Sequence, residues 1–142
     1  MLTRLIYTSR VSPGVDSRAV RDILAVSQRN NAEHGLTGAL LFNSQYFLQW
    51  LEGSRTAVNE RFRVIGTDKR HYEAEILDYV AINRRNFTSW SMGYAGEGAM
   101  NRDILFQYSK TSEFNPYTLS AESAVELITE LAQRSLTLEP NN

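Results

Sequence analysis

The sequence contains no cysteine among its 142 residues. It therefore has neither a disulfide framework nor a cysteine-ligated metal. Histidine is scarce as well, with His34 and His71 as the two examples, and we find no paired-carboxylate motif. We therefore expect no metal site. An excess of charge of one sign is also missing, because 15 basic residues balance 16 acidic ones to a formal net charge of -1. The balance gives no reason to expect nucleic acid or an anionic membrane surface as a partner.

Long hydrophobic runs are absent too. No apolar stretch approaches the roughly 20 residues of a membrane span, and residues 1–7 are too short and too soon polar for a signal peptide. We therefore expect a cytoplasmic protein without a membrane partner. The apolar content of 42% and charged content of 22% are ordinary for a globular protein. The length suits one domain with a short appendage.

One segment, Tyr-Phe-Leu-Gln-Trp-Leu-Glu-Gly at residues 46–53, places a polar amide on an apolar face. Side chains alternate along a strand, so Phe47, Gln49 and Leu51 share one face. A buried primary amide without a hydrogen-bond partner costs about 1–3 kcal/mol. The sequence therefore requires partners for Gln49.

The hydrophobic periodicity predicts an α+β fold with the order β-α-β-β-α-β-β. Strands are expected over residues 2–9, 36–42, 46–53, 75–82 and 90–94, and helices over residues 17–30 and 55–65. Asp16 or Ser17 can cap the first helix, and Ser54 can cap the second. This order favours a ferredoxin-like sandwich with both helices on one face of a mixed sheet.

The sequence becomes polar and glycine-containing after Gly96. We place a boundary there between a main domain of residues 1–97 and a C-terminal helical extension of residues 98–142. A short helix near residue 105 and an amphipathic helix ending near residue 135 are expected there. The apolar stripe of the second helix needs a partner surface. We expect that surface to be the open face of the sheet, which carries Ile6, Leu48 and Trp50.

Polar residues are expected to converge between the two main helices. Tyr7 and Gln49 should point to the same side of the sheet, and the end of the first helix brings Ser27, Asn30 and Asn31 nearby. Buried polar groups are usually satisfied by local bonds, so each residue alone has a structural explanation. Four amide or hydroxyl groups together (Tyr7, Asn30, Asn31 and Gln49) favour a planar ligand with several donors and acceptors.

Two further clusters have both a structural and a functional interpretation. The charged segment Asp68-Lys69-Arg70-His71 is either a solvated turn or a segment that binds the phosphates or ribityl chain of a cofactor. Trp90 and Met92 are either core residues or neighbours of a redox-active ring. Gly35 and Gly38 lack the pattern of a phosphate-binding loop.

Taken together, these motifs resemble the BLUF family, the sensors of blue light using flavin. The matching stretches are residues 4–9, 27–31, 35–38, 47–53, 68–71 and 90–93. They occur in the family's order over the first part of the chain. Any one of them is weak, whereas the set is specific.

The resemblance implies a flavin between the two main helices, usually FAD, with FMN as an alternative. Asn31 would then bond the polar edge of the ring, Asn30 would lie against the ring, and Gln49 would bond near its N5 and O4 atoms. Tyr7 would bond Gln49. The resemblance also places further pocket or tail contacts at Ser27, Asp68, Arg70 and His71.

The resemblance further implies a mechanism and a mode of signalling. Light would drive electron and proton transfer from Tyr7, leave Gln49 in a new hydrogen-bonded form and shift the absorption to the red. Trp90 and Met92 would relay the change. No output domain is recognised in the sequence, so we expect a non-enzymatic sensor that signals to an effector protein in trans or through a homo-oligomer.

Two other classes of function stay open from the residues alone. A small ferredoxin-like hydrolase would need an anion cradle, and no glycine-rich cradle is visible. A pure interaction module would carry an empty pocket and would be colourless even when expressed with abundant flavin.

Overall fold

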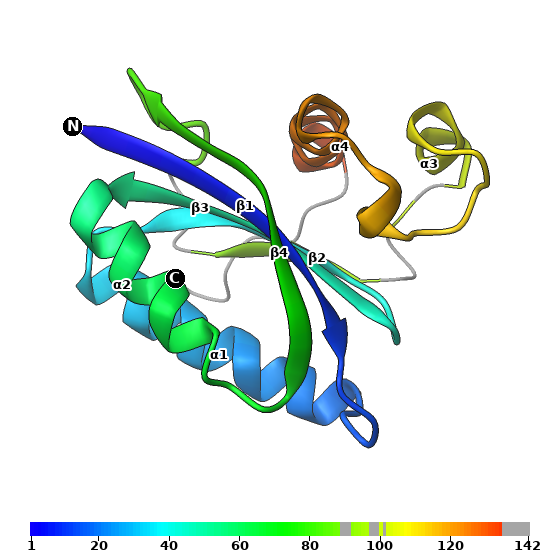
Figure 1. Ribbon diagram of the computed structural model, residues 1–142, viewed down its shortest axis with the longest axis horizontal. Coiled ribbons are helices and arrows are strands. Elements are labelled where there is room, and N and C mark those ends of the chain that lie inside the picture. The colour runs from blue at the N-terminus through cyan, green and yellow to red at the C-terminus, as the bar shows by residue number, and fades with distance from the viewer. Residues whose placement is uncertain (89–91, 97–99, 101, 135–142) are drawn as a thin grey trace.

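The computed structural model describes residues 1–88, 92–96, 100 and 102–134. Its strands form one mixed sheet in the order β4-β1-β3-β2-β5 (Figure 1). The strands are β1 (Leu2–Val11), β2 (Thr37–Phe42), β3 (Tyr46–Ser54), β4 (His71–Ile82) and β5 (Gly93–Ala95). The β2–β5 pair is parallel and the other neighbours are antiparallel. The expected α+β class is confirmed.

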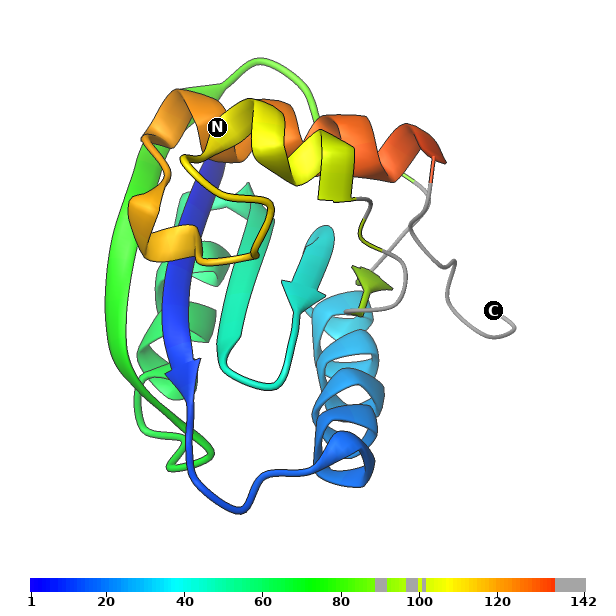
Figure 2. The same ribbon diagram turned by 90° about the vertical axis from the view of Figure 1, so that its right-hand side faces the viewer.

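The helices form two layers, one on each side of this sheet (Figures 1 and 2). Helices α1 (Ser17–Glu33) and α2 (Arg55–Ile65) cover one face, as expected. Helices α3 (Arg102–Tyr108) and α4 (Ala121–Arg134), joined through the short turn η2 (Pro116–Thr118), lie on the other. The carboxylate of Asp16 caps α1 and the hydroxyl of Ser54 caps α2, each by accepting a backbone N–H bond from the first helical turn. Among the described helices, none is both long enough and apolar enough to span a bilayer.

Several element boundaries differ from the sequence prediction. Strand β1 extends to Val11, β2 begins at Thr37, and β5 covers Gly93–Ala95 where we expected residues 90–94, of which 90 and 91 lie outside the described residues. Helix α1 continues past Asn30 to Glu33, and it ends where Gly35 adopts a φ of 68°. Strand β4 begins at His71, which we expected in a loop. Glu73 has a φ of 53°, and the β1–β4 register shifts nearby, so this part of β4 lacks the regular alternation by which a strand is recognised in sequence.

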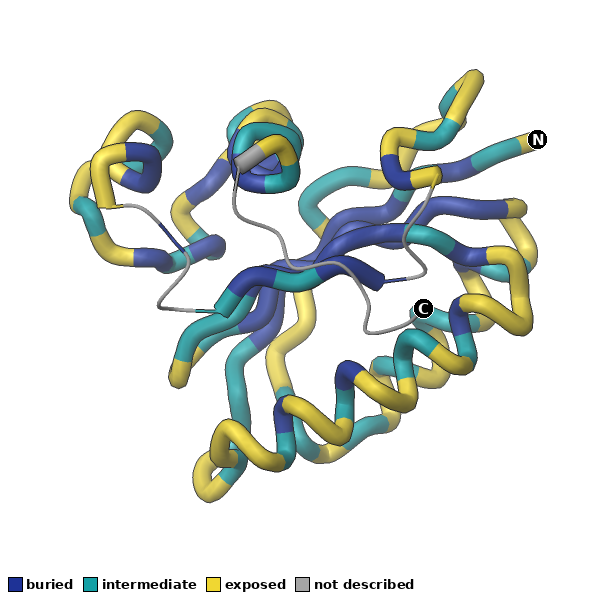
Figure 3. The backbone as a smooth tube through the Cα atoms, turned by 180° about the vertical axis from the view of Figure 1, so that it is seen from behind, coloured by how far each residue is buried: buried dark blue, intermediate teal, exposed yellow. Residues whose placement is uncertain are grey.

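The central strand β3 divides the core into two parts. On its α4 side, Leu48 and Trp50 are fully buried and share a cluster with Ile6 and residues of α4. On its α1 side, Phe47 packs in a second cluster with residues of α1. The middle of the sheet is accordingly the most buried part of the fold (Figure 3). The expected position of the C-terminal helix is confirmed, while the division into two domains at residue 97 stays a prediction.

A glycine allows β2 to lie closely against β3. A Cβ atom built on Gly38 would lie 1.9 Å from the carbonyl oxygen of Trp50. Real Cβ atoms do not approach a backbone oxygen so closely, so position 38 excludes other residues. The close pairing holds β3, with its Gln49, in the middle of the sheet.

Candidate functional site: a pocket between helices α1 and α2

A pocket of about 330 Å³ lies between α1, α2 and the sheet. This volume is within the usual range for small-molecule sites. The pocket contains seven of the residues that the sequence singled out: Tyr7, Ser27, Asn30, Gln49, Asp68, Arg70 and His71. Its other lining residues are Ile23, Val26, Leu40, Phe47, Arg61, Val64, Ile65 and Thr67.

Tyr7 and Gln49 are paired directly across β1 and β3 at the sheet side of this pocket. The Tyr7 hydroxyl donates to Oε1 of Gln49 at 2.5 Å, and both residues are only 4% exposed. Burial raises the pKa of Tyr7 above its ordinary value, and the negative charge of Asp68 raises it further. Tyr7 is therefore held as a neutral phenol that donates to the amide.

The other end of the Gln49 amide reaches the segment before β5. Its Nε2 donates to Sδ of Met92 at 3.6 Å, and Met92 is fully buried. A thioether is a weak acceptor, so this bond holds the amide only loosely. The Met92 carbonyl accepts from Nε2 of Gln28 at 3.1 Å, which ties this segment to α1. Trp90, the other expected relay residue, lies outside the described residues.

The two asparagines of α1 take different positions. Asn30 lines the pocket, whereas Asn31 is 1% exposed and is not among the lining residues. Successive residues of a helix point about 100° apart, so neighbours in sequence cannot share one direction. The expected convergence of four polar residues thus becomes three at the pocket with Asn31 buried beside them.

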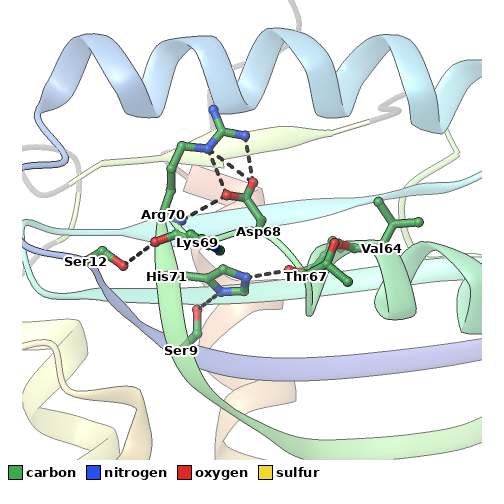
Figure 4. Close-up of polar contacts among 9 residues, drawn as sticks. Ser9, Ser12, Val64, Thr67, Asp68, Lys69, Arg70 and His71 are labelled. Carbon is green, nitrogen blue, oxygen red and sulfur yellow. Dashed lines mark hydrogen bonds and ion pairs between the residues drawn. The ribbon is translucent and has the colours of Figure 1, made fainter.

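A charged pair stands at the mouth of the pocket. Arg70 donates from Nη2 to Oδ2 of Asp68 at 2.6 Å and from its backbone N–H to Oδ1 at 2.9 Å. In Figure 4 both side chains extend from the loop toward α1. The side-chain bonds from Arg70 lower the pKa of Asp68, and the same contact raises the pKa of Arg70. The pair is therefore charged and oriented at neutral pH.

His71, the first residue of β4, forms side-chain contacts with both β1 and α2 beside the pocket. Its Nδ1 lies 2.7 Å from Oγ of Ser9 on β1, and its Nε2 lies 2.6 Å from the carbonyl oxygen of Ile65 on α2 (Figure 4). A carbonyl can only accept, so Nε2 carries the proton of this bond. The imidazole therefore has a clear structural role, and its contact with a ligand stays a prediction.

Among the lining residues that the sequence analysis did not assign to the site, three change its surface most. Val26 and Val64 are 39% and 53% exposed, although they are apolar, and they belong to α1 and α2 respectively. Arg61 adds a cation from α2. The signal in the sequence was weak, because each residue lies just off the apolar stripe that defines its helix.

Comparison with known proteins identifies the family of this chain. Residues 2–93 match the family model described as BLUF, sensors of blue-light using FAD. The chain belongs to the BLUF family. It is 37% identical over 86 residues to the blue light- and temperature-regulated antirepressor BluF of Escherichia coli (strain K12), a match that covers 59% of this chain and 21% of that protein. It is 28% identical over 116 residues to the photoactivated adenylate cyclase subunit beta of Euglena gracilis, covering 78% of this chain and 14% of that protein.

Solved BLUF structures share the fold over nearly the whole chain. BlsA in its photo-activated state has a TM-score of 0.88 at 28% identity, covering 98% of this chain and 100% of BlsA. The dark state of BlrB, a BLUF protein, has a TM-score of 0.77 at 31% identity, covering 92% and 94%. By contrast, the chain spans about a fifth or less of the curated relatives named above, at 21% and 14% of their lengths.

The BLUF pocket has the chemistry that a flavin requires. Apolar side chains of α1 and α2, among them Val26 and Val64, suit the faces of a flat ring. Gln49 and Asn30 supply amide groups for its polar edge, and Arg70 supplies a cation at the mouth for a phosphate. The residues present therefore fit FAD, the cofactor that the family uses.

Proposed function

We propose that this BLUF chain is a blue-light photoreceptor whose switch is the pair Tyr7 and Gln49. The observation that carries the proposal is the bonding of the Gln49 amide. Its oxygen accepts from Tyr7 at the pocket, and its nitrogen donates to Met92. One buried amide thus connects the pocket to the segment that leads into β5.

The bound flavin would supply the absorption of blue light and an acceptor for one electron. Tyr7 would give up that electron, and its hydroxyl proton would move toward Oε1 of Gln49 along the 2.5 Å bond. Both would return to Tyr7 when the charge recombines. The buried, neutral phenol favours this route, because a tyrosinate would have no proton to pass on.

Gln49 retains the signal as a changed pattern of hydrogen bonds. Rotation of its amide would turn Nε2 toward Tyr7 and Oε1 toward Met92, and a tautomer of the amide would change the donors without rotation. The bond to a thioether is weak, so the bond from Tyr7 is the main one that a rotation has to break. Hydrogen bonds are worth about 1 kcal/mol each, which suits a reversible switch.

In this proposal the cofactor is held by the remaining polar residues that line the pocket, together with the buried Asn31. Asn30 and Asn31 serve the ring, with Ser27 beside them on the same helix. Asp68, Arg70 and His71 serve the ribityl chain and phosphates. FAD is the preferred cofactor, and FMN shares the ring system that the switch needs.

We also propose that the signal leaves the domain through protein contacts, without catalysis by this chain. Met92 would relay the change in Gln49, together with Trp90. The recipient would be an effector protein in trans or another copy in a homo-oligomer, in the cytoplasm and without direct contact to nucleic acid or membrane. The named relatives include an antirepressor and a cyclase subunit, so family members serve different outputs.

An absorption spectrum taken in darkness and directly after blue light tests the proposal. We expect a flavin spectrum that shifts slightly to the red and relaxes in the dark. A flavin spectrum that does not shift would overturn the switch. A colourless protein that cannot be loaded with FAD would favour the interaction module, and hydrolase activity of the flavin-free protein would favour the enzyme.

A further inference from the structure

A fully buried carboxylate lies on the opposite face of β3 from Gln49. Glu52 is 0% exposed. Its Oε1 accepts from Nε1 of Trp50 and from the backbone N–H of Asn86, both at 3.0 Å. Its Oε2 accepts from the Thr37 hydroxyl at 3.0 Å and from the backbone N–H of Phe87 at 2.7 Å. Four donors therefore offset the cost of burying this charge.

Half of these donors belong to the connection that follows β4. Asn86 and Phe87 present consecutive backbone N–H groups to the carboxylate, and the ring of Phe87 packs edge-on against Trp50 at 5.0 Å. Arg85 completes the attachment: it donates to the Thr37 hydroxyl at 2.8 Å and to the Glu52 carbonyl at 3.1 Å. The connection is thus fixed on the neighbouring strands β2 and β3.

Met92 lies a short distance further along the sequence from these anchored residues. Met92 follows Phe87 by five positions and accepts the bond from Gln49 Nε2. Two residues of β3 therefore contact this part of the chain, one on each face of the strand. Gln49 binds Met92 on the pocket side, and Glu52 anchors the approach to Met92 on the α4 side.

We propose that Glu52 is a positioning residue, which sets the place of Met92 on the Gln49 amide by anchoring residues 85–87. The inference rests on the proposed photoreceptor function. Glu52 does not line the pocket, so it acts through the connection. Each oxygen of the Glu52 carboxylate accepts from one backbone N–H group, and a backbone donor cannot be turned around. An amide in place of the carboxylate keeps one acceptor oxygen, so its NH2 group would face one of these backbone N–H donors.

The test uses the flavin-loaded chain with Glu52→Gln, and its first measurement is made in darkness. The sequence has three methionines, Met1, Met92 and Met100, so methyl NMR of labelled methionine yields few signals. We expect the Met92 methyl signal to move while the Met1 signal stays in place. The dark recovery of the red-shifted form should slow by about fivefold, the equivalent of one hydrogen bond.

Asp78→Asn is the matched control. Asp78 is a carboxylate that is also largely buried, with a side chain 11% exposed, but it binds Nε of Arg4 at 2.6 Å. The same chemical change should leave the Met92 signal and the recovery rate unchanged. If Asp78→Asn alters both as much as Glu52→Gln does, the effect is a general one and the proposal is wrong.

A double variant separates positioning from general stability. Because Glu52 acts through Met92, adding Glu52→Gln to a Met92→Leu background should change the recovery rate no further. Additive effects would overturn the inference.

Arg85→Gln provides a second route if Glu52→Gln does not fold, and we expect the same NMR signal to move. An unmoved signal and normal recovery, in a protein that binds flavin and shifts to the red, would refute the inference alone. Loss of the red shift in the unmodified chain would instead refute the proposed function.

Discussion

Tyr7 and Gln49 lie directly opposite each other on β1 and β3, and the Tyr7 hydroxyl donates to the Gln49 amide oxygen at 2.5 Å. Facing positions in an antiparallel pair bring side chains close together, so the sheet register itself creates this contact. Gln49 also bonds Met92, which makes the amide a junction between the pocket and the segment before β5. The predictions below start from this junction.

Tyr7→Phe should abolish the light-induced red shift and leave flavin binding intact. Phenylalanine keeps the ring that packs near Phe62 at 5.3 Å, but it has neither the proton nor the donor that Gln49 requires. Dark and light absorption spectra measure the effect. Tyr46→Phe is the control, because Tyr46 packs on the α4 side of β3, and it should photocycle normally. A Tyr7→Phe protein with a normal red shift would contradict the assigned switch.

Alkaline pH offers a second test of Tyr7. An ordinary tyrosine has a pKa of 10.0, and burial raises the pKa of Tyr7 above that value. The folded state then holds this proton more tightly than the unfolded state. Its stabilisation is complete below pH 10 and declines as the pH rises through the folded pKa. The free energy of unfolding should fall by about 1.4 kcal/mol per pH unit above 10 from this residue.

Chemical denaturation of the wild type and Tyr7→Phe across this pH range isolates the contribution of Tyr7. The variant should lose stability less steeply. Parallel curves for the two proteins would show that Tyr7 titrates normally in the fold.

Met92→Leu should slow dark recovery by up to about fivefold. Leucine fills a similar volume, so stability should change by less than about 1.5 kcal/mol, but the Gln49 N–H loses its sulfur acceptor. Recovery of the dark form re-forms that bond, and its loss lowers the driving force. Met100→Leu is the control, because Met100 is buried in the cluster on the other side of the sheet. Equal recovery rates in the two variants would rule out a role for the Met92 sulfur.

Asp68→Asn should weaken FAD binding by about fivefold. The pair with Arg70 is partly exposed, so its contribution is close to that of a surface ion pair, roughly 1 kcal/mol. The bonds from Arg70 hold the pKa of Asp68 below its ordinary value, so the carboxylate stays charged throughout mildly acidic and neutral pH. Binding measured by fluorescence quenching should therefore be unaffected by this group between pH 7 and 5. Glu73→Gln removes an acid paired with Arg10 instead and should leave the affinity unchanged.

Gly38→Ala should cost about 3 kcal/mol of folding free energy, at the upper end of the range for overpacking. Its methyl group would lie 1.9 Å from the Trp50 oxygen, and neither strand can move without losing the sheet pairing. Gly66→Ala is the control, because its new methyl group would lie 3.5 Å from the nearest atoms in a helical conformation. Urea unfolding measures both. A Gly38→Ala protein as stable as Gly66→Ala would show that β2 and β3 adapt easily.

Local patterns in the sequence determined the faces of β3, the caps of both main helices and the family. The alternation of Phe47, Gln49 and Leu51 gave the inward face, since a strand can present its side chains only to two sides. Asp16 or Ser17 marked the start of the first helix and Ser54 that of the second, because such side chains bond backbone N–H groups a few residues away, and the structure selects Asp16. These features depend on neighbours in the chain, so they can be recognised without a fold.

Tertiary structure alone decided which of the polar residues meet. Asn30 and Asn31 are adjacent in sequence, yet the rotation of α1 brings Asn30 to the pocket lining and buries Asn31 beside it. Glu52 finds its backbone partners 34 and 35 positions away, and Gln49 finds Met92 43 positions away. No periodicity encodes such distances, because they follow from strand order and from the path of the connection across the sheet.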